Sequence, residues 1–199
     1  MKTPTNLLSA LIAGLLISSP AWAGFNEALA AWKRGDYAAA LKEFKPLAAK
    51  GNTSAQYNLG VIYANGRGVP RNDKEAVKWY RLAAGNGNVE AQYALGLMYG
   101  HGRGVPQDFT KAVRLWKPIA EKGDLRAQYV LGIMYGKGDG VPQDYRHAYK
   151  WFNIAATRGH AQAKTARNAL ANRMTAADVS EAQKLSRAWL AKHPVTKDK

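Results

Sequence analysis

Cysteine is absent from this chain of 199 residues, and its absence removes several kinds of chemistry at once. Disulfide bonds, thiolate metal sites, a cysteine nucleophile and a lipidated N-terminal cysteine are all excluded. Packing alone must therefore hold the fold together. Acidic residues are scarce as well: 14 Asp and Glu stand against 29 Lys and Arg, which gives a formal net charge of +15. Such a charge favours acidic partners and says nothing about the fold.

Long apolar segments are also lacking, with one exception near the N-terminus, from Leu7 to Ile17. Lys2 precedes this run and Ala21-Trp22-Ala23 follows it. A basic residue, a short apolar run and an A-x-A site are typical of a secretory signal peptide, and the run is too short to span a bilayer. We therefore expect residues 1–23 to be removed and the protein to be exported, to a bacterial periplasm in the simplest case or out of the cell.

The expected export changes the interpretation of the positive charge. In a cytoplasmic protein the same excess of Lys and Arg would first indicate nucleic acid. Outside the cytoplasm the acidic partners are envelope proteins, anionic cell-wall glycans and lipid headgroups. We therefore expect a protein partner of acidic character or an anionic glycan or lipid surface, and we expect no nucleic acid.

Internal repetition is what the chain has in abundance. Residues 55–88 read AQYNLGVIYANGRGVPRNDKEAVKWYRLAAGNGN, and the pattern returns 36 residues later at 91–124 and again at 127–160. Each copy has two segments with apolar residues at helical spacing, here called helix A and helix B, separated by a G-x-G-V-P or closely similar loop. Self-similarity at a fixed period of this length predicts a stacked array of helical hairpins.

Turn residues indicate where the helices of each hairpin begin and end. Gly66 can end helix A in a left-handed conformation, and Pro70 prevents the helix from continuing. Gly87 and its equivalents can close helix B in the same way. A residue suited to cap the N-terminus of helix B stands at one register in all three copies: Asn72, Asp108 and Asp144.

A glycine also recurs inside helix A, at Gly60, Gly96 and Gly132. Glycine within a helix costs about 1 kcal/mol relative to alanine. Its return in every copy therefore predicts a close approach, and we expect two helix backbones to touch at this position.

The flanks of the array are modified copies that can cover its exposed ends. In the first flank, Arg34-Gly35-Asp36 spells a cell-adhesion tripeptide, but a glycine turn followed by a helix-capping Asp36 explains it better. In the last flank, Thr175 and Asp178 resemble a capping box. We predict these divisions: signal peptide 1–23, capping hairpin 24–52, repeat 1 at 53–88, repeat 2 at 89–124, repeat 3 at 125–160, capping helices 161–193 and flexible tail 194–199.

The chain resembles the Sel-1-like repeat family, which is related to the tetratricopeptide repeat. The resemblance rests on A-x-A-Q-Y-x-L-G-x-x-Y, G-x-G-V-P-x-D and the A-A and G of helix B, and it covers nearly all of residues 24–194. It implies an all-α fold, a right-handed α-solenoid of stacked helix–turn–helix repeats with period 36, whose concave face is lined by helix A. It also implies an adaptor that assembles protein complexes. Some cysteine-rich relatives have been associated with β-lactam binding or hydrolysis, and because this chain lacks their cysteines we do not expect that activity here.

Catalytic and cofactor motifs are not found in the sequence. The glycines from Gly100 to Gly104 lack the preceding strand and the spacing of a dinucleotide fingerprint, and no G-K-[ST] follows. The four histidines form no H-x-x-x-H pair, and no serine sits in G-x-S-x-G. We therefore expect no catalytic residue, no cofactor and no metal site, and we interpret the protein as a non-catalytic binding protein.

Two surfaces are candidates for binding. On helix A, two registers vary between copies, as positions that set specificity on a rigid repeat scaffold do. These candidate partner-binding residues are Asn58, Ala94 and Val130, and beside the turn Asn65, His101 and Lys137. On helix B, two registers repeat a positive charge, which stacking would align into a basic stripe. The stripe consists of Lys42, Lys78, Arg114 and Lys150 at one register and Lys45, Arg81 and Lys117 at the other.

The two surfaces correspond to two hypotheses. In the first, the protein is an interaction scaffold in the bacterial envelope and holds its ligand on the concave helix A face. In the second, the basic stripe docks on an anionic cell-wall polymer, glycan or lipid, and its binding weakens as salt rises. The same pattern also fits a polar helix face that is only solvated and binds nothing. Trp79 and Leu115, at one helix B register, are expected to pack between repeats.

Overall fold

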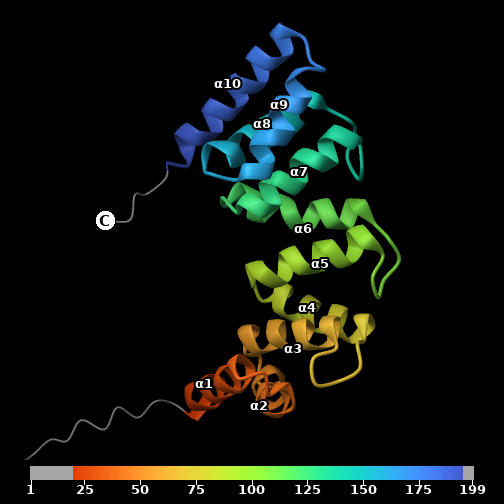
Figure 1. Ribbon diagram of the computed structural model, residues 1–199, viewed down its shortest axis with the longest axis vertical. Helices are drawn as coiled ribbons and strands as arrows, with labels where there is room; N and C mark the ends of the chain where they lie inside the picture. Colours follow the sequence, from red (N-terminus) through yellow and green to blue (C-terminus); the bar gives the residue numbers. More distant parts are fainter. Residues whose placement is uncertain (1–19, 195–199) are drawn as a thin grey trace, which may run out of the picture.

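The computed structural model describes residues 20–194, which form ten α-helices and no strand (Figure 1). The prediction of an all-α solenoid of helical hairpins is confirmed. No helix of this part of the chain is long and apolar enough to cross a membrane. The helices are α1 (Pro20–Lys33), α2 (Tyr37–Ala49), α3 (Thr53–Asn65), α4 (Asp73–Gly85), α5 (Val89–His101), α6 (Phe109–Glu121), α7 (Leu125–Lys137), α8 (Tyr145–Thr157), α9 (Ala161–Ala171) and α10 (Ala176–Lys192).

The predicted signal peptide falls almost wholly on residues 1–19, outside the described residues. α1 begins at Pro20, so its first turn contains the residues before the expected cleavage point. The predicted tail also lies outside the described residues, apart from Pro194.

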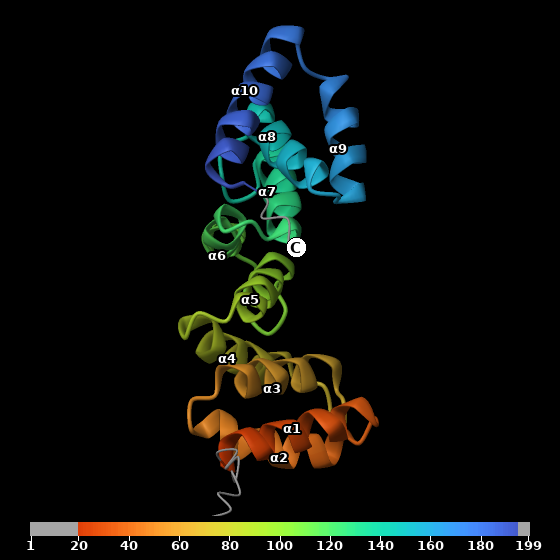
Figure 2. The same cartoon turned by 90° about the vertical axis from the view of Figure 1, so that its left-hand side faces the viewer.

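Consecutive helices pack against one another from α1 to α9, and the result is an elongated stack (Figures 1 and 2). The constant apolar positions of the repeats form the core: Leu59 and Leu131 are fully buried and Leu95 nearly so. Buried clusters extend across repeat boundaries, since Trp116 of repeat 2 and Trp151 of repeat 3 share one cluster. Each repeat therefore buries its apolar face against its neighbours, as a solenoid requires.

The predicted helix caps are present. The side chains of Asn72, Asp108 and Asp144 accept hydrogen bonds from backbone N–H groups in the first turn of α4, α6 and α8, at 2.8–3.1 Å. Gly66 adopts the left-handed conformation at the end of α3, with φ of 67°. Gly87, two residues after the end of α4, lies in the same region with φ of 83°. These caps fix the length of every helix in the three repeats.

The glycines inside helix A have a different role from the predicted one. A Cβ atom on Gly60, Gly96 or Gly132 would overlap an aromatic ring of helix B in the same repeat. The rings belong to Tyr80, Trp116 and Phe152, respectively. The expectation that two helix backbones touch there is therefore wrong, because an aromatic side chain, and not a second backbone, fills the space that glycine leaves.

The second glycine of each G-x-G loop joins one unit to the preceding one. A Cβ on Gly104 would overlap the backbone of Asp73, and one on Gly140 would overlap that of Phe109. Gly104 and Gly140 have φ of 68° and 71°, a conformation that other residues rarely adopt. Asp73 and Phe109 are the first residues of helix B in repeats 1 and 2, so the loop of each repeat rests on the helix B of its predecessor.

Ion pairs reinforce the contacts between repeats. The Arg103 guanidinium lies 2.9 Å from the Asp73 carboxylate, which also pairs with Arg71 at 2.6 Å. Hydrogen bonds from Arg71 and Arg103 lower the pKa of Asp73 to about 2. On the other edge of the stack, Arg126 pairs with Glu90 at 2.7 Å. Charged side chains thus connect adjacent repeats at both edges.

The two C-terminal helices pack on the last repeat at different places. α9 and α10 both pack on α8, and Figure 2 shows them on opposite sides of it. Trp189 of α10 lies against Trp151 of α8, with ring centroids 6.2 Å apart, and its Nε1 donates to Glu121 Oε2 at 2.9 Å. Thr175 caps α10 by accepting a hydrogen bond from the Asp178 N–H at 3.1 Å. α10 therefore covers a part of α8 that the equivalent helices α4 and α6 leave open.

Candidate functional site

Helices α3, α5, α7 and α9 repeat one face, because residues three, four and seven positions apart lie on the same side of a helix. We call it the helix A face and define it by three registers. None of its members is fully buried. The first register is Asn58, Ala94, Val130 and Ala166; the second is Val61, Leu97, Ile133 and Ala169; the third is Asn65, His101, Lys137 and Arg173, the last of which follows the end of α9.

The first and third registers contain all six residues that the sequence predicts for partner binding. Their chemistry changes along the stack. Asn58 and Asn65 each donate a side-chain hydrogen bond at 2.9 Å to a carbonyl of their own helix, and both are neutral. Lys137 and Arg173 are exposed and cationic at the other end. The third register therefore runs from neutral in repeat 1 to positive beyond repeat 3.

The apolar second register was missed in the sequence. Val61, Leu97 and Ile133 are apolar in every copy, and a constant apolar position normally belongs to the core. In the structure they are only partly buried and lie between the two varying registers. The signal that distinguishes them is their spacing of three residues from Asn58, Ala94 and Val130. The helix A face is thus apolar along its middle.

A cavity of about 250 Å³ lies in this face where α7, α8 and α9 meet. Its apolar wall includes Ile133, Ala169 and Leu170, and Lys137 and Arg173 also line it. Arg173 is fixed in place because its Nη2 donates to the Tyr145 hydroxyl at 2.7 Å. An apolar hollow with two cations fits an apolar side chain that stands close to a carboxylate.

The basic stripe is only partly formed. Lys42, Lys78 and Arg114 are exposed, as are the three residues of the second register, Lys45, Arg81 and Lys117. Lys150 differs, because it lies partly buried with its Nζ 4.4 Å from the centroid of the Trp151 ring. Burial lowers the pKa of Lys150. The predicted alignment of four exposed cations therefore ends at Arg114.

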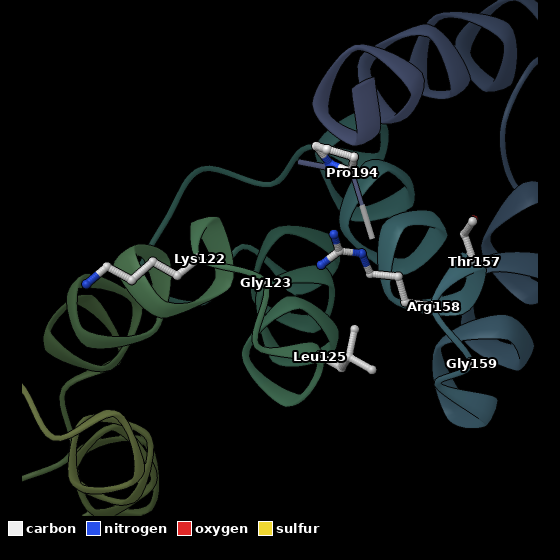
Figure 3. A pocket seen from close by; sticks show the side chains of 7 residues that line it. All are labelled: Lys122, Gly123, Leu125, Thr157, Arg158, Gly159 and Pro194. Atoms are coloured by element: carbon white, nitrogen blue, oxygen red, sulfur yellow. The ribbon is translucent and has the colours of Figure 1, made fainter. Parts of the chain in front are cut away.

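Another cavity, of about 800 Å³, lies at the other edge of the stack, between the turns that follow α6 and α8 and the end of α10. Figure 3 shows Arg158 directed toward Pro194 and Lys122 directed away from it. Arg158 Nη2 donates to the His193 carbonyl at 2.7 Å, and its Cζ lies 5.0 Å from the Trp189 ring centroid. No carboxylate or histidine lines this cavity among the described residues. Arg158 thus joins the end of α10 to α8.

Three of the four histidines have contacts that explain their presence. His147 Nδ1 lies 2.8 Å from the Asp144 carboxylate, and His160 Nδ1 accepts from the Ala163 N–H at 3.2 Å as the cap of α9. His193 stacks on Trp189 with centroids 4.0 Å apart. Within residues 20–194 no three His, Asp or Glu side chains are grouped closely enough to hold a metal ion.

Comparison with known proteins identifies the repeat. The Sel1 repeat model matches residues 53–88, 89–124 and 125–160. Over 45 residues, 23% of this chain, the sequence is 47% identical to the rat protein DAP3-binding cell death enhancer 1 and 44% identical to its mouse counterpart. The matched segment spans only 9% of the length of each of these curated relatives.

Solved structures give the same result over most of the chain. The Sel1 repeat protein from Oxalobacter formigenes is 25% identical, with a TM-score of 0.70 over 84% of this chain and 70% of that one. The structure of c5321, a protective antigen of uropathogenic Escherichia coli strains with an SLR fold, is 27% identical. Its TM-score is 0.60 over 87% of this chain and 46% of that one.

These findings agree with the capped hairpins, the interlocked loops and the shared core described above. Proteins of this kind are generally non-catalytic scaffolds that mediate protein–protein interactions. Since the repeat model covers more than half of the residues, the chain belongs to the Sel1 repeat family.

Proposed function

We propose that this protein is an interaction scaffold of the bacterial envelope, without catalytic activity, that holds a protein partner on the helix A face. The observation that carries the proposal is the cavity between α7 and α9, which combines an apolar wall with Lys137 and Arg173. It lies on a face that continues over four helices without a buried residue in its three registers. A rigid repeat scaffold with varied side chains on such a face is suited to bind an extended segment of another protein.

The chemistry of the face indicates what the partner presents. An apolar side chain fills the hollow beside Ile133 and Ala169, and an adjacent carboxylate pairs with Lys137 and Arg173. The positive net charge of the chain increases the rate at which an acidic partner meets it. The rat and mouse relatives are named for binding a protein, DAP3, which agrees with a protein ligand for the shared repeat.

Export to the envelope is supported by the N-terminal pattern of Lys2, the apolar run from Leu7 to Ile17 and Ala21-Trp22-Ala23. The resemblance to an antigen of a bacterial pathogen points in the same direction. Fractionation of cells that express the full chain tests this part. We expect the protein in the periplasmic fraction with Gly24 as its first residue, and an intact N-terminus in the cytoplasmic fraction would contradict it.

The binding face is tested with two double variants of equal charge change. Lys137→Glu with Arg173→Glu alters the cavity of the helix A face, and Lys42→Glu with Lys78→Glu alters the basic stripe. Both pairs replace two exposed cations with two anions, so the net charge of the protein is the same in both. Each variant and the unchanged protein are used as bait for an envelope extract, and retained proteins are identified after low-salt and high-salt washes.

We expect one protein to be retained by the unchanged chain and by the stripe variant, and to be lost from the cavity variant. Direct titration of that purified protein should then give at least tenfold weaker binding for the cavity variant, about 1.4 kcal/mol. Loss of binding in the stripe variant alone, with retained material that high salt removes, would instead assign the function to docking on an anionic glycan or lipid.

A further inference from the structure

One helix B register differs in repeat 2 from its equivalents on either side. Trp79 in repeat 1 and Trp151 in repeat 3 correspond to Leu115 in repeat 2, at intervals of 36 residues. Trp151 is 2% exposed. Trp79 packs on the cluster of the preceding unit, as predicted, so both indoles fill space between helices. The smaller Leu115 fills less of this space.

A cavity of about 360 Å³ lies beside Leu115. Leu95 and the Tyr99 ring line it together with Leu115, and its cations are Lys111 and Arg114. In repeats 1 and 3 an indole of the protein itself, Trp79 or Trp151, fills the space at this register. In repeat 2 the register lacks the indole, and the cavity is open to a side chain from outside.

The polar groups around this cavity differ in the hydrogen bonds and salt bridges that they make. The Tyr99 hydroxyl accepts a hydrogen bond from Arg81 Nη2 at 2.7 Å, and Lys111 Nζ pairs with Asp108 at 3.0 Å. The Arg114 side chain makes no hydrogen bond or salt bridge to any of the described residues and is exposed. Arg114 therefore provides a guanidinium for a carboxylate beside an apolar cavity.

The chain itself shows how a helix can cover this register. α10 lies on α8, with Trp189 against Trp151, and Ile154 beneath it is fully buried. The equivalent of Ile154 in repeat 1 is Leu82, which is 45% exposed, and its equivalent in repeat 2 is the exposed Pro118. α6 thus offers the surface that α10 covers on α8, and the cavity beside Leu115 lies next to it.

We propose that the cavity beside Leu115 binds a Trp or Phe side chain of a helical segment of a partner protein, with an acidic residue next to the aromatic one. The apolar lining receives the ring, and Arg114 pairs with the carboxylate. This surface is separate from the helix A face and does not depend on it. The scaffold then has two docking surfaces and connects two partners.

N-acetyl-L-tryptophan is a direct probe, because it carries an indole and a carboxylate in one small molecule. Methyl NMR of the full chain should show shifts at Leu95 and Leu115, with a dissociation constant in the millimolar range, roughly 1–10 mM. N-acetyl-L-tryptophanamide, which lacks the carboxylate, should bind about fivefold more weakly, because it cannot pair with Arg114.

Leu115→Trp places in repeat 2 the residue that repeats 1 and 3 carry, and it should abolish the binding. Leu82→Trp is the matched control, since it makes the same change at an exposed position of α4 that does not line the cavity, and it should leave the binding unchanged. Arg114→Gln leaves the cavity open and should remove the difference between the acid and the amide, which tests the proposal even if Leu115→Trp does not fold.

Several results would overturn the proposal. Absence of shifts at Leu95 and Leu115, equal binding of acid and amide by the unchanged protein, or unaltered binding by a folded Leu115→Trp variant would each do so. A lipid occupant gives another pattern: vesicles of phosphatidylglycerol would bind the unchanged protein and not Leu115→Trp, while N-acetyl-L-tryptophan would cause no shifts.

Discussion

The two junctions between the three full repeats have the same backbone arrangement and different side-chain connections. At the junction of repeats 1 and 2, the connection is made from the G-x-G loop. Arg103 Nη2 lies 2.9 Å from Asp73 Oδ1 and donates to the carbonyl of Ala64 at 3.1 Å. The loop of repeat 2 therefore holds both helices of repeat 1.

At the junction of repeats 2 and 3, Asp139 stands where Arg103 stands one repeat earlier, so the loop offers no cation. The connection is made at the opposite edge, by the first turn of α7. Arg126 pairs there with Glu90 of repeat 2 at 2.7 Å and with Asp124 at 2.7 Å. A repeat array can thus keep one geometry and change the residues that secure each joint.

The carboxylates that bridge from one repeat to the next differ in their exposure to water, whereas Asp124, which is 14% exposed, pairs with Arg126 only two residues away in the chain. The Asp73 side chain is 19% exposed, whereas Glu90 is 48% exposed. Exposed ion pairs contribute little because water and salt screen them. The junction of repeats 1 and 2 should therefore gain more from its ion pair than the junction of repeats 2 and 3.

The largest expected effect comes from breaking the backbone contact that both junctions share. Gly104→Ala places a Cβ against the backbone of Asp73 in a left-handed conformation, and it should lower the free energy of unfolding by about 3 kcal/mol. Gly87→Ala is the control, since Gly87 is left-handed with open space around it, and it should cost about 1 kcal/mol. Urea denaturation measures both, and equal costs would show that the close approach contributes nothing.

Removal of the ion pair of the first junction should have the next largest effect. Arg103→Ala should cost about 1.5 kcal/mol, because it leaves the Ala64 carbonyl and the Asp73 carboxylate without their common partner. Arg71→Ala removes the other partner of Asp73, within the same repeat and 58% exposed, and should cost less than about 0.5 kcal/mol. If the two variants were equally unstable, the bridge between repeats would not be the source of the stability.

Acid should weaken the first junction. The pKa of Asp73 is lowered to about 2, below the value of about 3.9 in an unfolded chain. Its contribution is therefore complete above about pH 4 and is lost as the pH falls toward about 2. Compared with Asp73→Asn, the unchanged protein should be about 1 kcal/mol more stable at neutral pH and should lose that advantage in acid. Parallel chemical denaturation across this range measures it, and a constant difference would contradict the assignment.

The second junction should give the smallest effect. Arg126→Ala should cost about 0.5 kcal/mol in dilute buffer, and about 1 M sodium chloride should remove most of that cost. Arg103→Ala should keep more of its cost under the same conditions, because Asp73, the carboxylate it reaches in the neighbouring repeat, is less exposed than Glu90. A larger effect for Arg126→Ala than for Arg103→Ala would reverse the comparison.

The sequence was a good guide to the local structure of the repeats. The caps at Asn72, Asp108 and Asp144 and the glycine ends of the helices follow from short-range rules, and all of them are present. It was a poorer guide to which residue of another helix each glycine contacts. The partner of Gly96 is an indole and not a backbone, and the partner of Gly104 is a helix end of another repeat. Such pairings depend on three-dimensional packing, which periodicity does not describe.

The candidate surfaces show the same limit. Variation between copies indicated Asn58 and Lys137 as candidate binding residues, because positions outside the core are free to differ. It could not identify Ile133, whose constant apolar character resembles that of a core residue. It also gave no warning that α10 would cover Lys150, since α10 lies outside the repeating pattern. The difference between Leu115 and its Trp equivalents was visible in the sequence, and only the structure shows that a cavity accompanies it.

The different ion pairs at the two junctions also limit how the number of repeats can change by duplication of the gene. A tandem duplication of residues 89–124 would preserve the period and every turn. It would nevertheless place Arg103 of the second copy beside Phe109 of the first, which has no carboxylate, and Glu90 of one copy beside Glu90 of the other. The new junction would lack the ion pairs of both existing ones. The charged side chains at each junction therefore match only the present order and number of repeats, although the backbone of each repeat would fit any other.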